Sequence, residues 1–211
     1  MNGEKKSQRG PRTRVLDGTA FFISAAFSPY LLSVLFVLLI SFLYAESLKQ
    51  FLPWILISLF FIGIIPAGYI FWLLENKKVS DIHLSRHQER KIPFLVGASS
   101  ALIGVLLLYF LGAAKPILTV VLAYAANAVL ICIITWYWKI SIHSAFFTAS
   151  VLIVMLFFGP KFWPLFFLWI PLAWARVHRK KHTPEQILAG AVVAILVTMM
   201  VFYFLGYKIG S

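Results

Sequence analysis

Long apolar runs are the feature that most constrains what this chain can fold into. Hydrophobic residues make up 61% of its 211 positions, whereas charged residues make up only 12%. Several runs approach the roughly 20 residues that a helix needs to cross a bilayer. Helices are the expected spanning element, because lipid cannot hydrogen-bond free backbone groups and the sequence lacks the alternating pattern of a β-barrel. The sequence therefore predicts an all-α, polytopic membrane helix bundle.

Seven apolar segments follow one another along the chain. They lie at about 19–45, 51–74, 94–113, 117–138, 145–158, 162–175 and 187–206. Pro164 and Pro171 interrupt the sixth segment, so the fifth and sixth form either two helices or a re-entrant hairpin, and we expect six to seven spans. The first run is too long for a signal peptide. We therefore expect residues 1–18 to form a basic tail and residues 19–211 to form a single transmembrane domain.

All five histidines lie where the apolar runs break. His83 and His87 share one polar stretch, His143 lies in a second, and His178 and His182 lie in a third. Between each neighbouring pair of stretches, the chain enters the bilayer in one apolar segment and returns in the next. All three stretches should therefore emerge on the same face of the bilayer. Imidazole can serve as base, acid or nucleophile near neutral pH. The grouping predicts one active site assembled from distant segments.

The net charge of +12 is distributed unevenly between the two membrane faces. Basic residues cluster in the N-terminal tail and in the histidine-bearing stretches, and the opposite face keeps only Lys49, Lys115, Lys161 and Lys208. The positive-inside rule and anionic headgroups account for this pattern without a nucleic-acid partner. We expect an integral protein of a prokaryotic plasma membrane, with its N-terminus and its histidine face in the cytoplasm.

Two short motifs lie in the second and third polar stretches. The third stretch contains Arg176, followed at the sixth position by His182, and the second contains Ser141-Ile-His143. In these residues the chain resembles the type 2 phosphatidic acid phosphatase (PAP2) superfamily of membrane lipid phosphatases. That family carries the motifs K-x6-R-P, P-S-G-H and S-R-x5-H-x3-D. Arg176 and His182 have the spacing of the third motif, and isoleucines stand where the second motif has its proline and glycine.

The resemblance implies a two-step phosphoryl transfer that needs no metal or other cofactor. His182 would attack phosphorus to form a phosphohistidine, and His143 would protonate the departing lipid oxygen. Arg176 would hold the phosphate oxygens, since planar guanidinium matches phosphate geometry. Ser141, at the start of a helix, would aim free backbone N–H groups toward the anion. A phosphorylated lipid is the implied partner.

Two departures from the family pattern concern the substrate and the arginines that would hold the phosphate. Gln186 stands where the commonest third motif has the aspartate that orients the nucleophilic imidazole. This His-Thr-x-x-Gln form resembles the dolichyl diphosphatase branch, which implies an isoprenoid phosphate or diphosphate as substrate. In place of the first motif, Arg86 and Arg90 are the nearest counterparts of its arginine. In a helix they would share a stripe with the histidines of the same stretch.

Other interpretations of the same residues are open. Gln186 could close a capping box with Thr183 at the start of a helix, and the basic residues at 179–181 could be membrane anchors. The His83-x3-His87 spacing suits a metal, but no third ligand is evident. Seven scattered acids argue against a magnesium-dependent prenyltransferase or a glutamate protease. A relative that binds or moves a phosphorylated lipid without hydrolysing it would keep the same arginines.

Overall fold

The computed structural model describes residues 11–81, 84 and 86–207. Its α-helices are α1 (Pro11–Ala26), α2 (Pro29–Tyr44), α3 (Leu48–Ser58), α4 (Ile65–Glu75), α5 (Lys91–Phe110), α6 (Lys115–Thr135), α7 (Ile142–Phe158), α8 (Trp169–His178) and α9 (Pro184–Phe204). A π-helical segment, η1 (Leu59–Ile64), joins α3 to α4, and two 3-10 segments, η2 (Gln88–Arg90) and η3 (Pro160–Leu168), precede α5 and α8. The described residues contain no β-strand, which confirms the predicted all-α fold.

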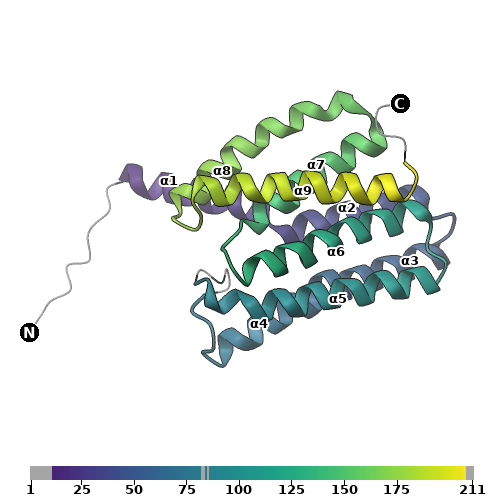
Figure 1. The fold of residues 1–211 in the computed structure, drawn as a ribbon, viewed down its shortest axis with the longest axis horizontal. Coiled ribbons are helices and arrows are strands. Elements are labelled where there is room, and N and C mark those ends of the chain that lie inside the picture. Colours follow the sequence, from purple (N-terminus) through teal and green to yellow (C-terminus); the bar gives the residue numbers. More distant parts are fainter. Residues whose placement is uncertain (1–10, 82–83, 85, 208–211) are drawn as a thin grey trace, which may run out of the picture.

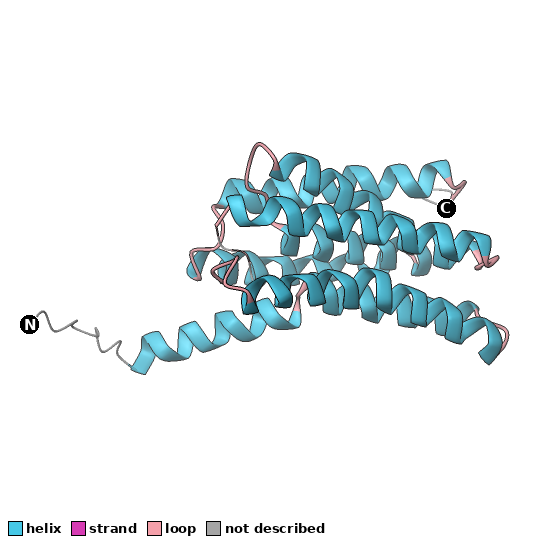
Figure 2. Ribbon diagram, turned by 90° about the horizontal axis from the view of Figure 1, so that it is seen from below, coloured by secondary structure: helices cyan, strands magenta, loops and turns pink. Residues whose placement is uncertain are grey.

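The helices lie side by side along one axis, and the chain reverses direction at the two ends of the bundle (Figure 1, Figure 2). Among the described residues, five helical segments are long and apolar enough to cross a bilayer: Thr13–Tyr44, Leu48–Glu75, His87–Phe110, Lys115–Thr135 and Pro184–Phe204. The shorter apolar helix α7 leaves one end of the bundle, and η3 with α8 returns to that end (Figure 1). The protein is an integral membrane helix bundle. Whether six or seven segments span fully stays a prediction.

Three connections gather at the same end of the bundle: α4 to α5, α6 to α7, and α8 to α9 (Figure 1). They are the three histidine-bearing stretches, which were predicted to share a face. His87 and His182 lie in these connections, and His143 and His178 lie in the adjoining first turn of α7 and last turn of α8. His83 lies outside the described residues. We call this end the histidine end.

Side-chain caps and prolines fix where the helices near the histidine end begin. Ser28 Oγ accepts the Leu31 N–H at 3.2 Å, with Pro29 in the first turn of α2. Ser141 Oγ accepts the Ser144 N–H at 3.4 Å at the start of α7. Each cap satisfies a backbone donor that a helix leaves unpaired in its first turn.

Helix α7 packs mainly against α9 and also contacts α2 and α6. Its Ala145 and Ala149 are fully buried, and such small residues let neighbouring helix backbones approach closely. The Tyr124 hydroxyl of α6 and Ser150 Oγ of α7 are hydrogen-bonded at 2.8 Å. These contacts give α7 a fixed position, and it is α7 that carries His143.

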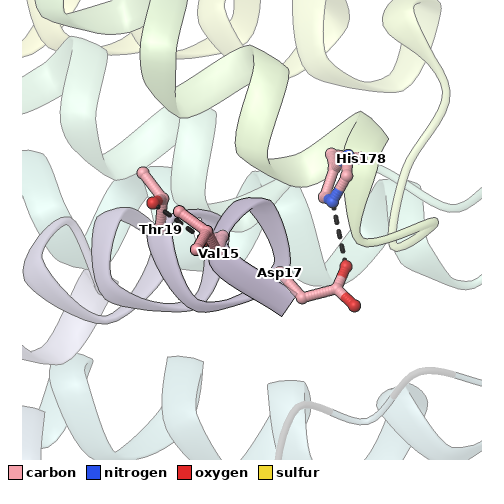
Figure 3. Close-up of polar contacts among 4 residues, drawn as sticks. All are labelled: Val15, Asp17, Thr19 and His178. Carbon is pink, nitrogen blue, oxygen red and sulfur yellow. Dashed lines mark hydrogen bonds and ion pairs between the residues drawn. The ribbon is translucent and has the colours of Figure 1, made fainter. Parts of the chain in front are cut away.

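Helix α1 begins at Pro11, so residues 11–18 of the predicted tail are helical. Figure 3 shows α1 lying against α8, where Asp17 faces His178. The division into residues 1–18 and 19–211 stays a prediction, and residues 1–10 lie outside the described residues.

Candidate active site

A close crossing of α7 and α9 brings two of the histidine-bearing stretches together. The Ser141 N–H donates to the Gln186 carbonyl at 3.1 Å, and Ser144 Oγ donates to the Ile187 carbonyl at 2.7 Å. Gly190 permits this approach, because a Cβ there would lie 2.5 Å from the Ser141 carbonyl oxygen. The crossing fixes the start of α7, which carries His143, against the start of α9, which follows His182.

His182 lies beside this crossing and is oriented by Gln186. Its Nδ1 lies 3.0 Å from Gln186 Oε1, which also accepts the Thr183 N–H at 3.3 Å. A backbone N–H can only donate, so the amide atom at this position is the oxygen, and His182 Nδ1 must be the protonated nitrogen. The tautomer leaves a lone pair on Nε2. That atom is buried and has no hydrogen-bond partner among the described residues.

The surroundings of His182 keep its imidazole neutral. Burial lowers the pKa of His182 well below its usual value, and the charges of Arg90 and Arg176 lower it further, against a smaller opposing effect of the Gln186 hydrogen bond. A neutral imidazole with a free Nε2 lone pair is the form that a nucleophile or base requires.

Arg176, on the last turns of α8, is the least satisfied charged group of the site. Its side chain is only 1% exposed. Its Nε and Nη1 are buried and find no hydrogen-bond partner in the part of the chain that the structure describes. A buried guanidinium without partners is costly. The geometry therefore suits an anion with oxygens that can accept from both nitrogens.

Arg90 is equally buried but is held by the backbone. Its Nε donates to the Leu84 carbonyl at 2.7 Å, and its Nη1 donates to the Ile140 carbonyl at 3.2 Å. These bonds tie the α4–α5 connection to the α6–α7 connection. They also place a fixed positive charge close enough to His182 to lower the pKa of its imidazole.

A cavity of about 160 Å³ joins several of these groups. Arg90, His143 and Arg176 line one part of it, and residues of the α1–α2 junction line another. One water molecule needs only about 15 Å³ of such space, so the cavity can hold a larger polar group. His182 lines a neighbouring open pocket with Lys139 and Gln186 and does not line this cavity. Ser141 does not line the cavity either. It is fully buried, and its hydroxyl caps α7.

The other first-motif residues lie apart from this cluster. The Arg86 side chain is 77% exposed and lies 3.8 Å from Glu89, so the structure does not bring it to the cavity. His87 Nε2–H donates to the Thr135 carbonyl at 2.6 Å. The predicted helical stripe does not form, because Leu84 has a left-handed backbone (φ 49°) and the following segment is 3-10. His83 lies outside the described residues.

Two charged residues join the site that the sequence analysis did not single out. Lys139 lines a pocket together with His182. Burial lowers the pKa of the Lys139 ammonium, and the charges of Arg90, Lys181 and Arg176 lower it further. Asp81 pairs with Lys181 at 3.7 Å. Lys139 could have been suspected from its position four residues before His143 in the second stretch. Nothing in the sequence marked Asp81.

The fold and this site define an α-helical integral membrane protein with a buried histidine–arginine centre suited to an anion. Residues 135–209 match the sequence profile of the PAP2 superfamily. The matched range contains Ser141, His143, Arg176, His182 and Gln186, whereas Arg86 and Arg90 precede it. The comparison with curated proteins found no match, and neither did the comparison with solved structures.

Proposed function

We propose that this protein is a membrane lipid phosphatase that forms a phosphohistidine at His182. One observation carries the proposal: the free Nε2 of a neutral, oriented imidazole lies in the same buried centre as an arginine with two unpaired donors. Phosphoryl transfer depends on positioning and on fixed positive charge around the equatorial oxygens. The match of residues 135–209 to the PAP2 superfamily supports the same chemistry.

The reaction proceeds in two displacements. In the first, the His182 Nε2 lone pair attacks phosphorus, the bond from phosphorus to the leaving oxygen breaks, and protonated His143 gives that oxygen a proton. In the second, neutral His143 takes a proton from a water molecule that attacks the phosphohistidine, which releases inorganic phosphate and restores His182. Arg176 and Arg90 hold the phosphate oxygens in both steps. No metal is needed to balance either step.

The surroundings of the cavity support a lipid substrate. The cavity shares Pro29, Tyr30, Phe94 and Ile142 with a narrow apolar slot of about 60 Å³ that continues between the helices. Pro66, Gly97 and Ala101 line this slot. A phosphorylated lipid fits this arrangement with its headgroup at the arginines and the first part of its tail in the slot. We propose an isoprenoid phosphate or diphosphate as substrate because of the His-Thr-x-x-Gln third motif. We propose that it is reached from the cytoplasmic leaflet because the positive-inside rule places the histidine end there.

Phosphate release from a substrate panel tests the proposal. Purified protein in detergent with EDTA is given farnesyl diphosphate, farnesyl phosphate and phosphatidic acid. We expect release that survives EDTA and disappears in His182→Ala. The control His87→Gln lies outside the cavity and keeps a donor for the Thr135 carbonyl, so it should retain activity. Full activity in a folded His182→Ala variant would overturn the nucleophile assignment.

A second candidate is a protein that binds or moves a phosphorylated lipid without hydrolysing it. The observation that favours it is Gln186, which accepts from His182 but supplies no negative charge to stabilise an imidazolium. In the same panel, saturable lipid binding to the wild type without phosphate release would select this candidate over the phosphatase.

A further inference from the structure

Helix α1 presents one face to the rest of the protein, and Ser24 lies on that face. Asp17, Ala20 and Ser24 are spaced i, i+3 and i+7, which places them on one side of a helix. His178 Nε2–H of α8 donates to Asp17 Oδ1 at 3.0 Å (Figure 3). Ala20 and Ser24 are buried, whereas Phe22 on another face is exposed. Helix α1 is therefore docked on the bundle along this face.

The Ser24 hydroxyl is buried at 1% exposure and lines the cavity that Arg90, His143 and Arg176 share. A serine inside a helix usually bonds the carbonyl four residues before it when its side chain is shielded from water. Ser24 Oγ makes no hydrogen bond with any described residue. A buried hydroxyl without a partner is unfavourable, and Ser24 lines the cavity in which the proposed function places a phosphate group.

We propose that Ser24 donates a hydrogen bond to the phosphate-bearing headgroup of the substrate, which makes helix α1 part of the substrate-binding site. The assignment rests on the proposed function, because that function places an anion in this cavity. The other polar groups named at the cavity, Arg90, His143 and Arg176, suit an anionic ligand, and such a ligand accepts from a hydroxyl. Ser24 precedes the range that matches the PAP2 superfamily, so the assignment comes from the structure.

The neighbouring serines separate this role from ordinary packing. Ser28 also lines the cavity, but its hydroxyl is used as the cap of α2. Ser41, in the last turn of α2 at the far end of that helix, is as buried as Ser24 and likewise has no partner among the described residues. It does not line the cavity. Ser41→Ala is therefore a matched control for Ser24→Ala.

Kinetics on farnesyl diphosphate test the assignment. Ser24→Ala should raise KM about tenfold, which is the usual scale for one lost hydrogen bond to a charged group, and should leave kcat within about twofold. Its thermal stability should not fall, since the lost hydroxyl has no partner among the residues that the structure describes. Ser24→Thr should restore most of the affinity, and Ser41→Ala should match the wild type in both constants.

The inhibition constant of inorganic phosphate then locates the contact. If Ser24→Ala raises this inhibition constant in parallel with KM, the hydroxyl contacts the phosphate that is transferred. If KM rises and the inhibition constant is unchanged, the hydroxyl contacts the oxygens nearer the lipid. Either result supports the assignment. A wild-type KM in a stable Ser24→Ala variant overturns it and leaves the phosphatase proposal intact. If the wild type releases no phosphate, calorimetric binding of farnesyl phosphate replaces KM: weaker binding by Ser24→Ala supports the assignment, and equal binding overturns it.

Discussion

Gln186 combines two roles that the sequence analysis treated as alternatives. Its Oε1 accepts the Thr183 N–H, as in a capping box at the start of α9, and it also accepts the Nδ1–H of His182. Helix geometry explains why both are possible. The third residue of the helix lies next to the N-cap residue and to the residue before it, so one amide oxygen reaches both donors. The side chain that begins the helix therefore also sets the tautomer of His182.

Substitutions at Gln186 separate the two roles. Gln186→Leu removes the acceptor and should lower kcat at least about tenfold, because Nδ1 is no longer fixed as the protonated nitrogen. It should also destabilise the protein by about 1 kcal/mol through the lost cap. Gln186→Glu keeps an acceptor of the same length and should retain or raise activity. Steady-state phosphate release and thermal unfolding in detergent measure both effects. Unchanged kcat in Gln186→Leu would restrict Gln186 to capping.

The lowered pKa of His182 also predicts how stability depends on pH. In the unfolded chain this histidine binds a proton below its ordinary pKa of about 6.5, whereas in the folded protein it stays neutral. The unfolded state therefore binds more protons, and the free energy of unfolding falls as the pH decreases through this value. Between pH 7 and pH 5 the contribution approaches about 2 kcal/mol, at about 1.36 kcal/mol per pH unit.

Thermal unfolding in detergent at pH 7 and pH 5 measures this dependence. His182→Asn removes the titrating group and should lose less stability than the wild type over the same pH interval. Equal losses in the two proteins would show that other groups carry the pH dependence.

At the scale of elements, the crossing of α7 and α9 depends on Gly190. In Gly190→Ala the new Cβ would lie 2.5 Å from the Ser141 carbonyl oxygen, so the two helices must separate and His182 must shift relative to His143. We expect a loss of at least about 1 kcal/mol of stability and most of the activity. Gly68→Ala in α4 is the control, because nothing lies within 4 Å of its new Cβ. It should be neutral or stabilising. Wild-type activity in Gly190→Ala would contradict this account of the site.

The apolar slot that continues from the cavity and lies beside α5 leads to a second prediction at this scale. Ala101→Leu fills part of the slot and should raise KM for farnesyl diphosphate several-fold. It should leave the turnover of a short water-soluble phosphate monoester unchanged, since that substrate has no tail to place there. Ala67→Leu adds the same side chain at an exposed position of α4 and serves as the control. Equal KM values in the two variants would remove the slot from the substrate path.

At the scale of the whole molecule, some features could be predicted from the sequence and others could not. Apolar run lengths predicted the helices, and the alternation of the spans predicted that the histidine-bearing stretches share an end. Which arginine of the first stretch turns inward could not be predicted, because a left-handed residue at Leu84 and the 3-10 turn η2 break the helical spacing between Arg86 and Arg90. Ser24 carried no sequence signal, since its role depends on where α1 docks.

The orientation of the bundle is the last prediction, and it rests on charge outside the site. Leaving out the buried arginines, the described residues of the histidine end still carry exposed Arg14, Lys77, Lys78, Arg86 and Lys180, whereas those of the opposite end carry Lys49, Lys115 and Lys161. The positive-inside rule counts basic residues near the ends of the spans, so the histidine end should face the cytoplasm. In a Cys132→Ala background, an impermeant maleimide should label Lys161→Cys in intact cells but label Lys77→Cys only after the membrane is opened. The reverse pattern would place the site on the outer face and make its lipid substrate one of the outer leaflet.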